Sequence, residues 1–324
     1  MRRLILLAPL IFACGTSGSS RIDGGPADRR VADADLGPSD AADATDARAP
    51  EAGIADASTL DASTPDAGAL DRHEVLFIGN SYTYGNDLPE LYRALVASLS
   101  PAPAALSVDS VTAGGRRLTQ HAAEAADEAQ RLGGLLAADG PPWTQVILQE
   151  QSQIPGFGPG QPDFDASRVA AAELGARIAA RGAQAVFFMT WGRRAGDSSN
   201  PARFGDFSAM QGHLETGYRA LAQAAREAGA EAVIAPVELA FAEVHAEDGA
   251  VGDPLEASSL FSRLYASDGS HPSLLGSYLA ACVFAATTLQ IDATTITYAP
   301  TELDEADAQR LREVAQRVVQ RERG

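Results

Sequence analysis

Three polar side chains in this sequence have the types and spacing of a hydrolytic centre. Ser81 ends the segment Gly-Asn-Ser, which directly follows the apolar run Val75–Ile78. Asp268 and His271 stand close together near the other end of the chain, in Asp-Gly-Ser-His-Pro. Serine needs an adjacent base to act as a nucleophile, histidine is a suitable base, and a carboxylate can hold the imidazole in the required tautomer. The pattern indicates that Ser81 attacks a carbonyl carbon.

Each half of this pattern also has a purely structural interpretation. Gly, Asn and Ser commonly end a strand, and Asp-Gly-Ser-His is a usual composition for a turn. We expect Asn80 to cap the turn and Gly79 to serve backbone geometry. The two motifs favour catalysis only in combination, when each follows its own element of an α/β chain.

Apolar strand-like segments alternate with helical segments from residue 73 onward. This alternation indicates parallel βαβ units with right-handed crossovers. We therefore expect one three-layer α/β/α domain with about five parallel strands. The expected strands lie at 75–78, 106–112, 145–149, 183–191 and 230–237, and the expected helices at 88–99, 118–138, 165–180, 204–228, 274–289 and 302–321.

Small and polar residues follow these strands, beyond the carboxyl ends where ligands of parallel sheets bind. The segments are Ala113–Gly115, Gln149–Ser152 and Trp191–Arg194. Together with Ser81 they are expected at one edge of the sheet. A tetrahedral intermediate needs hydrogen-bond donors for its oxyanion, and glycine allows the backbone to approach closely.

The first block, Gly-Asn-Ser-Tyr-Thr, and the last block, Asp-Gly-Ser-His-Pro-Ser, resemble the SGNH (GDSL-type) hydrolase superfamily, and especially a branch of bacterial lipoproteins. The resemblance covers nearly all of residues 73–289. It implies a flavodoxin-like fold and a serine esterase that needs no cofactor or metal. It assigns Ser81, Asp268 and His271 as the catalytic triad.

The resemblance also implies three oxyanion donors. The first is the N–H of Ser81, and the second is an N–H of Ala-Gly-Gly, for which we favour Gly115 over Gly114. The third is usually the Asn of a Gly-x-Asn-Asp block, which this sequence lacks. Leu-Gln-Glu-Gln-Ser stands in its place and is similar to a block of acetylesterase relatives, so Gln149 is the expected donor and Gln151 the alternative.

Other polar and aromatic residues have open interpretations. Tyr82 and Tyr84 either line a substrate cleft or cover the sheet edge, and Gln151 is a candidate for substrate binding. Arg193, with the arginine after it, either binds an anionic substrate such as an acidic sugar or lies in a solvated loop. His245 falls in an acidic segment that we expect to be a loop; the segment lacks the spacing of an EF-hand, so we expect no metal there.

The first part of the chain does not have the composition of a globular domain. Residues 1–14 have a basic start, a short apolar run and a lipobox-like end, which indicates a signal peptide with Cys14 as the lipidation site. Residues 15–72 contain no aromatic ring and are rich in Asp, Ala and Pro, which predicts a disordered tether. Residues 73–324 form the expected hydrolase-like domain. The only other cysteine is Cys282, so no disulfide is expected.

The net charge of −18 argues against a surface for nucleic acid or anionic membranes. The protein is expected to be exported and attached to the membrane by its lipid anchor alone, with the outer membrane preferred because Gly15 follows the lipidated residue. The expected function is a cell-envelope serine esterase that acts on O-acetylated carbohydrate or another small ester. The alternatives are an acyltransferase and a non-catalytic glycan-binding or scaffold protein. The sequence leaves the oligomeric state open.

Overall fold

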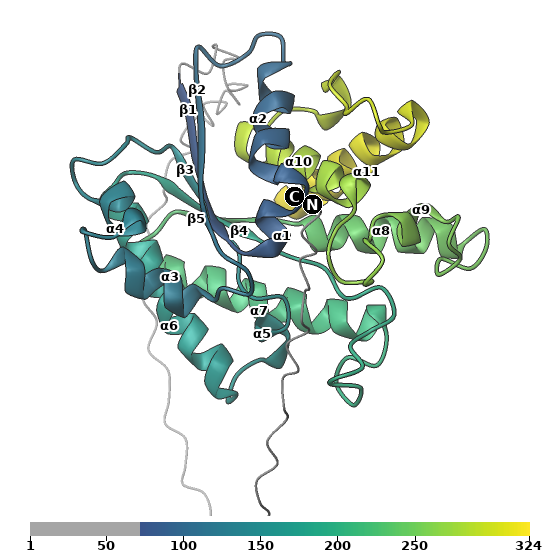
Figure 1. Cartoon of the computed structure of the whole chain (residues 1–324), viewed down its shortest axis with the longest axis horizontal. Coiled ribbons are helices and arrows are strands. Elements are labelled where there is room, and N and C mark those ends of the chain that lie inside the picture. Colours follow the sequence, from purple (N-terminus) through teal and green to yellow (C-terminus); the bar gives the residue numbers. More distant parts are fainter. Residues whose placement is uncertain (1–71) are drawn as a thin grey trace, which may run out of the picture. The chain divides into compact units, whose positions relative to one another are not determined.

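The computed structural model describes residues 72–324, which contain a single five-stranded parallel sheet in the order β2-β1-β3-β4-β5 (Figure 1). The strands are β1 Arg72–Gly79, β2 Ala105–Thr112, β3 Gln145–Leu148, β4 Gln184–Phe188 and β5 Ala232–Ala235. The predicted number, direction and places of the strands are confirmed. The predicted signal peptide, the lipidation site Cys14 and residues 15–71 of the predicted linker lie outside the described residues. Arg72, predicted as the last residue of the linker, begins β1.

Helices connect the strands and cover both faces of the sheet (Figure 1). They are α1 Ser81–Tyr84, η1 Gly85–Asp87, α2 Leu88–Ala97, α3 Leu118–Ala125, α4 Arg131–Leu136, α5 Ile154–Phe157, α6 Pro162–Ala180, α7 Phe207–Glu227, α8 Val237–Gly249, α9 Leu260–Arg263, α10 Leu274–Leu289, η2 Ala293–Thr295 and α11 Glu305–Arg323. In residues 72–324 none of these helices has the length and apolar character to cross a membrane.

The alternation of side chains along β1 explains the two hydrophobic layers. Val75 and Phe77 pack into the core beneath α2, α8, α10 and α11. Leu76 and Ile78 point to the opposite face and pack into the core beneath α3, α4, α6 and α7. A strand that is buried on both faces reads as a continuous apolar run, because each successive side chain enters one core or the other.

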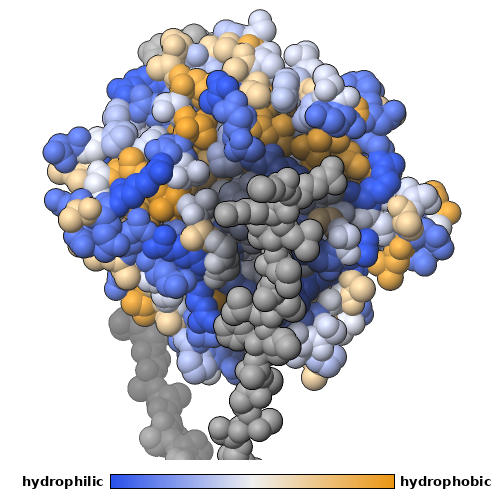
Figure 2. Space-filling view, viewed as in Figure 1, coloured by the Kyte–Doolittle hydropathy of each residue, from blue (hydrophilic) through white to orange (hydrophobic). Residues whose placement is uncertain are grey.

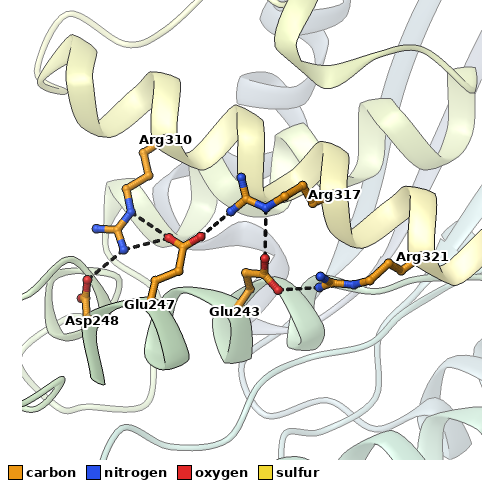
Figure 3. Close-up of polar contacts among 6 residues, drawn as sticks. All are labelled: Glu243, Glu247, Asp248, Arg310, Arg317 and Arg321. Carbon is orange, nitrogen blue, oxygen red and sulfur yellow. Dashed lines mark hydrogen bonds and ion pairs between the residues drawn. The ribbon is translucent and has the colours of Figure 1, made fainter. Parts of the chain in front are cut away.

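The helix α8 corrects one expectation, because the acidic segment around His245 was predicted as a loop. It is helical, and its acidic face forms ion pairs with a basic face of α11 (Figure 3). In these pairs Arg310 Nε lies 2.9 Å from Glu247 Oε2, and Arg317 Nε lies 3.0 Å from Glu243 Oε1. The paired residues are Glu243, Glu247 and Asp248 on α8 and Arg310, Arg317 and Arg321 on α11.

The predicted single helix over 118–138 is also wrong, because the chain forms two short helices there. After α3 ends, Asp127 Oδ1 accepts a hydrogen bond from Ala129 N at 3.0 Å, which closes a turn instead of continuing the helix. Helix α4 then folds back against this turn. A Cβ atom on Gly133 would lie 1.9 Å from the carbonyl oxygen of Asp127, so only glycine permits the close approach.

Candidate active site

Ser81 is the first residue of α1, just beyond the carboxyl end of β1, which lies between β2 and β3 in the sheet. Asn80 caps this short helix: its Oδ1 accepts a hydrogen bond from Tyr82 N at 3.2 Å, and its Nδ2 donates to Arg116 O at 2.9 Å. Gly79 is required for packing, because a Cβ atom there would lie 2.3 Å from Thr83 Oγ1. The sharp change from strand to helix therefore presents Ser81 at the edge of the sheet where ligands of parallel sheets bind.

The structure brings Ser81, His271 and Asp268 into one chain of hydrogen bonds. Ser81 Oγ lies 2.8 Å from His271 Nε2, and His271 Nδ1 lies 2.5 Å from Asp268 Oδ2. Asp268 Oδ1 accepts from the N–H groups of Ser270 and His271, both at 2.9 Å. Because a carboxylate can only accept, the proton of a neutral His271 is placed on Nδ1, and Nε2 can accept the proton of Ser81.

The hydrogen bonds of Asp268 also keep it ionised. Partial burial raises the pKa of this carboxyl group, but the hydrogen bonds from the His271 ring and from the two N–H groups outweigh burial and hold the pKa below its usual value. The loop that carries these N–H groups turns at Gly269, whose φ of +67° favours glycine. The turn Asp-Gly-Ser-His thus holds a charged carboxylate in hydrogen-bond contact with the imidazole.

Tyr82 holds the histidine loop in place and does not line an open cleft. Its ring is only 3% exposed, and its hydroxyl lies 2.6 Å from Ser270 Oγ. The ring stacks on Trp191 with a centroid distance of 5.0 Å and meets the edge of the His271 ring at 5.2 Å. Trp191 Nε1 donates to Ser270 O at 3.1 Å. Of the two interpretations left open for Tyr82, burial disfavours a place in a substrate cleft, because it leaves almost none of the residue's surface for a ligand, and the contacts indicate a positioning role.

Gln149 also differs from its expected role as the third oxyanion donor. The side chain is fully buried, and its Oε1 accepts from Asn80 N at 2.8 Å and from Thr83 Oγ1 at 2.9 Å. Its Nε2 donates to the carbonyl of Glu150. The amide therefore ties the turn that carries Ser81 to the end of β3.

The N–H groups of Ser81 and Gly115, the two predicted backbone donors, have no acceptor among residues 72–324, and neither has the N–H group of Gly114. The loop that contains Gly115 is held beside the nucleophile turn by Ala113 N, which donates to Gly79 O at 3.4 Å, and by the contact of Asn80 with Arg116 O. Gly115 has a φ of +65°, and a Cβ atom there would meet nothing within 4 Å. Both N–H groups are thus available to a ligand.

The remaining predicted residues are engaged with the surrounding scaffold. Gln151 Oε1 accepts from Gln153 N at 2.8 Å and stabilises the turn before α5. Arg193 Nη1 pairs with the buried Asp197 at 2.5 Å, and several other donors converge on the same carboxylate. Gln151 and Arg193 would each have to give up these hydrogen bonds to bind a substrate. By contrast, the other tyrosine of α1, Tyr84, is 48% exposed.

Sequence reasoning missed two buried residues that support the site. His121 Nε2 lies 3.0 Å from Gly79 O, and burial lowers the pKa of the ring to about 4, so the neutral ring donates to the last carbonyl of β1. Glu150 accepts from Leu118 N at 3.0 Å and from Ser167 Oγ, and burial raises its pKa. The one feature of the sequence that could have pointed to a role at the site was the position of Glu150, close behind a buried strand.

Within residues 72–324, no three side chains of the His, Cys, Asp and Glu types converge in a way that could hold a metal ion. Cys282 is buried in α10, and burial raises the pKa of its thiol to about 12, so it stays protonated. The chemistry available at this edge of the sheet is therefore that of Ser81, its histidine and carboxylate partners, and the two N–H donors.

The chain was compared with protein-family models, curated proteins and solved structures. No family model and no curated protein matches. A candidate SGNH hydrolase from Slackia heliotrinireducens is 31% identical, over 67% of this chain and 99% of that chain, with a TM-score of 0.47. A DUF4886 family protein from Bacteroides uniformis is 18% identical, over 77% of this chain and 95% of that chain, with a TM-score of 0.58. An acetylxylan esterase from Geobacillus stearothermophilus is 15% identical, over 72% of this chain and 96% of that chain, with a TM-score of 0.45.

Proposed function

We propose that this chain, which belongs to the SGNH hydrolase superfamily, is a serine esterase. The observation that carries the proposal is the hydrogen-bonded chain from Ser81 Oγ through His271 to Asp268, with distances of 2.8 Å and 2.5 Å. A protein that only binds a ligand has no need of a nucleophile, a base and an orienting carboxylate in this order. A non-catalytic glycan-binding or scaffold role is therefore disfavoured.

The proposed reaction begins when His271 Nε2 accepts the proton of Ser81, whose Oγ attacks the carbonyl carbon of the ester. The N–H groups of Ser81 and Gly115 stabilise the negative oxygen that develops. His271 then gives its proton to the leaving alkoxide as the carbon–oxygen bond breaks, which leaves an acyl group on Ser81. A water molecule, deprotonated by His271, releases the acyl group as a carboxylic acid.

The proposed substrates are small acyl esters, chiefly O-acetyl groups on carbohydrate. Two features support this choice: the similarity of the Gln149 block to that of acetylesterases, and the predicted export of the chain to the cell envelope. We also propose that a lipid on Cys14 anchors the protein, with the outer membrane as the preferred location. The segment between Cys14 and residue 73 would then give the domain reach toward surface glycans.

The proposal is tested by hydrolysis of p-nitrophenyl acetate by the purified protein and by two variants. Ser81→Ala is expected to abolish turnover while the unfolding transition stays unchanged, because only the Oγ atom is lost. Ser198→Ala removes the hydroxyl of an exposed loop serine and is the matched control, for which full activity is expected. Wild-type turnover by a folded Ser81→Ala variant would refute the assignment of the nucleophile.

A further inference from the structure

Arg194 places a guanidinium group beside the catalytic histidine loop. Its N–H donates to Gly269 O at 2.8 Å. Its side chain runs along the same residue, since a Cβ atom on Gly269 would lie 3.6 Å from Arg194 Cβ and Nε and 3.7 Å from Nη2. Gly269 lies between Asp268 and His271, so the half-buried Arg194 is fixed against the loop that carries the base.

The charge of Arg194 has no partner among the described residues, unlike that of its neighbour. Arg193 is paired with Asp197, whereas the Arg194 guanidinium makes no hydrogen bond or ion pair with any side chain in 72–324. The nearest acid along the loop, Asp268, is already occupied, because one of its oxygens binds the His271 ring and the other accepts two N–H groups. In a chain with a net charge of −18, a cation without an ion pair beside the loop that carries His271 is a feature that needs a reason.

The place of Arg194 indicates which part of a substrate it would meet. His271 Nε2 must give its proton to the leaving oxygen, so the alcohol portion of the ester lies against the loop from Asp268 to His271. Arg194 is fixed to this same loop. An anion that reaches Arg194 therefore belongs to the alcohol portion of the substrate and not to the acyl group.

We propose that Arg194 binds a carboxylate on the alcohol portion of the substrate, so that acylated acidic sugars, such as O-acetylated uronic acids, are preferred over neutral ones. This inference rests on the proposed esterase function and adds its substrate class. A guanidinium binds a carboxylate through two parallel hydrogen bonds, which give geometric specificity as well as attraction.

The test uses two substrates that differ only in the carboxylate: the methyl glycosides of O-acetylglucuronic acid and of O-acetylglucose. The wild-type protein is expected to have a kcat/KM about tenfold higher for the uronate, as one charge-assisted interaction allows. Arg194→Gln should remove most of this ratio, and Arg194→Lys should retain part of it. Arg177→Gln is the matched control: it removes one exposed, unpaired charge from α6 and should leave the ratio unchanged.

Equal kcat/KM values for the two sugars in an active wild-type protein would overturn the inference. An equal fall for both sugars in Arg194→Gln would also overturn it, because it would show that Arg194 acts only on the histidine loop. A protein that hydrolyses neither ester contradicts the esterase function instead, so binding is measured separately in Ser81→Ala by NMR titration. Tighter binding of methyl glucuronoside than of methyl glucoside, lost on Arg194→Gln, supports the anion site, and equal binding refutes it.

Discussion

Replacing Gln149 by Leu separates a positioning role from a role as oxyanion donor. The leucine has a similar size but leaves the N–H of Asn80 and the carbonyl of Glu150 without their partner in a buried place. Each buried group that loses its partner costs about 1–3 kcal/mol. Thr83 can rotate its hydroxyl toward another acceptor, so we count two groups and expect a loss of about 2–6 kcal/mol in the free energy of unfolding.

The same substitution is expected to lower kcat, because the nucleophile turn is no longer tied to β3. A displacement of about 1 Å in the position of Ser81 would cost about 10²-fold in rate. Denaturant unfolding and hydrolysis of p-nitrophenyl acetate measure the two effects on the same protein sample. Gln223→Leu makes the same exchange on the exposed face of α7 and should change neither quantity.

Loss of an oxyanion donor alone gives a different result. It lowers kcat by about 10²–10³-fold and leaves the free energy of unfolding unchanged. A Gln149→Leu variant with wild-type stability and such a loss of kcat would therefore refute the positioning role, and it would restore Gln149 as the third donor.

Three further outcomes are expected. Burial lowers the pKa of His73 and His121 from 6.5 to about 4, so the contribution of the neutral rings to stability is complete above about pH 6.5 and is lost as the pH falls toward 4. The free energy of unfolding, measured with denaturant, should be lower at pH 5 than at pH 7 by about 2 kcal/mol per histidine. Equal values at the two pH values would contradict this. Tyr82→Phe removes the hydroxyl that bonds Ser270 and should cost about 1 kcal/mol of stability and lower kcat by about three- to tenfold; a wild-type kcat would argue against its positioning role. Arg317→Gln should cost less than about 1 kcal/mol, and less still at high salt, because the two ion pairs of Arg317 are partly exposed to solvent; a larger, salt-independent loss of stability would contradict this.

The sheet was predictable because its strands combine two local signals. Val75–Ile78 is apolar without interruption, and a polar turn follows it at once, so one segment indicates both a doubly buried strand and its end. Because the strands are parallel, their carboxyl ends lie together, and the polar segments that follow them gather at one edge of the sheet. The proximity of Ser81 and His271, 190 residues apart in the chain, follows from this topology.

The errors arise where distant residues decide the local outcome. The segment around His245 reads as a loop because its acidic residues have no local partners, but arginines of α11 neutralise them (Figure 3). Gln149 reads as a donor toward substrate because a sequence does not show that its amide binds Asn80 and Glu150 inside the fold. In both cases the deciding partner becomes visible only in three dimensions.

The face of the molecule seen in Figure 2 gives no separate indication of the substrate. In the view of Figure 2, hydrophobic residues lie in small groups among hydrophilic ones. Specificity is therefore best sought in individual side chains at the site, such as the exposed Tyr84 and the unpaired Arg194.

The central claim is that Ser81 is an activated nucleophile, and labelling with a fluorophosphonate tests it most directly. The reagent forms a covalent bond only with a serine whose proton is removed by a neighbouring base. The account predicts one phosphonate per chain, located on Ser81 by peptide mapping, and its loss when His271 is replaced by Ala. A folded protein that is labelled at another serine, or not at all, would contradict the account.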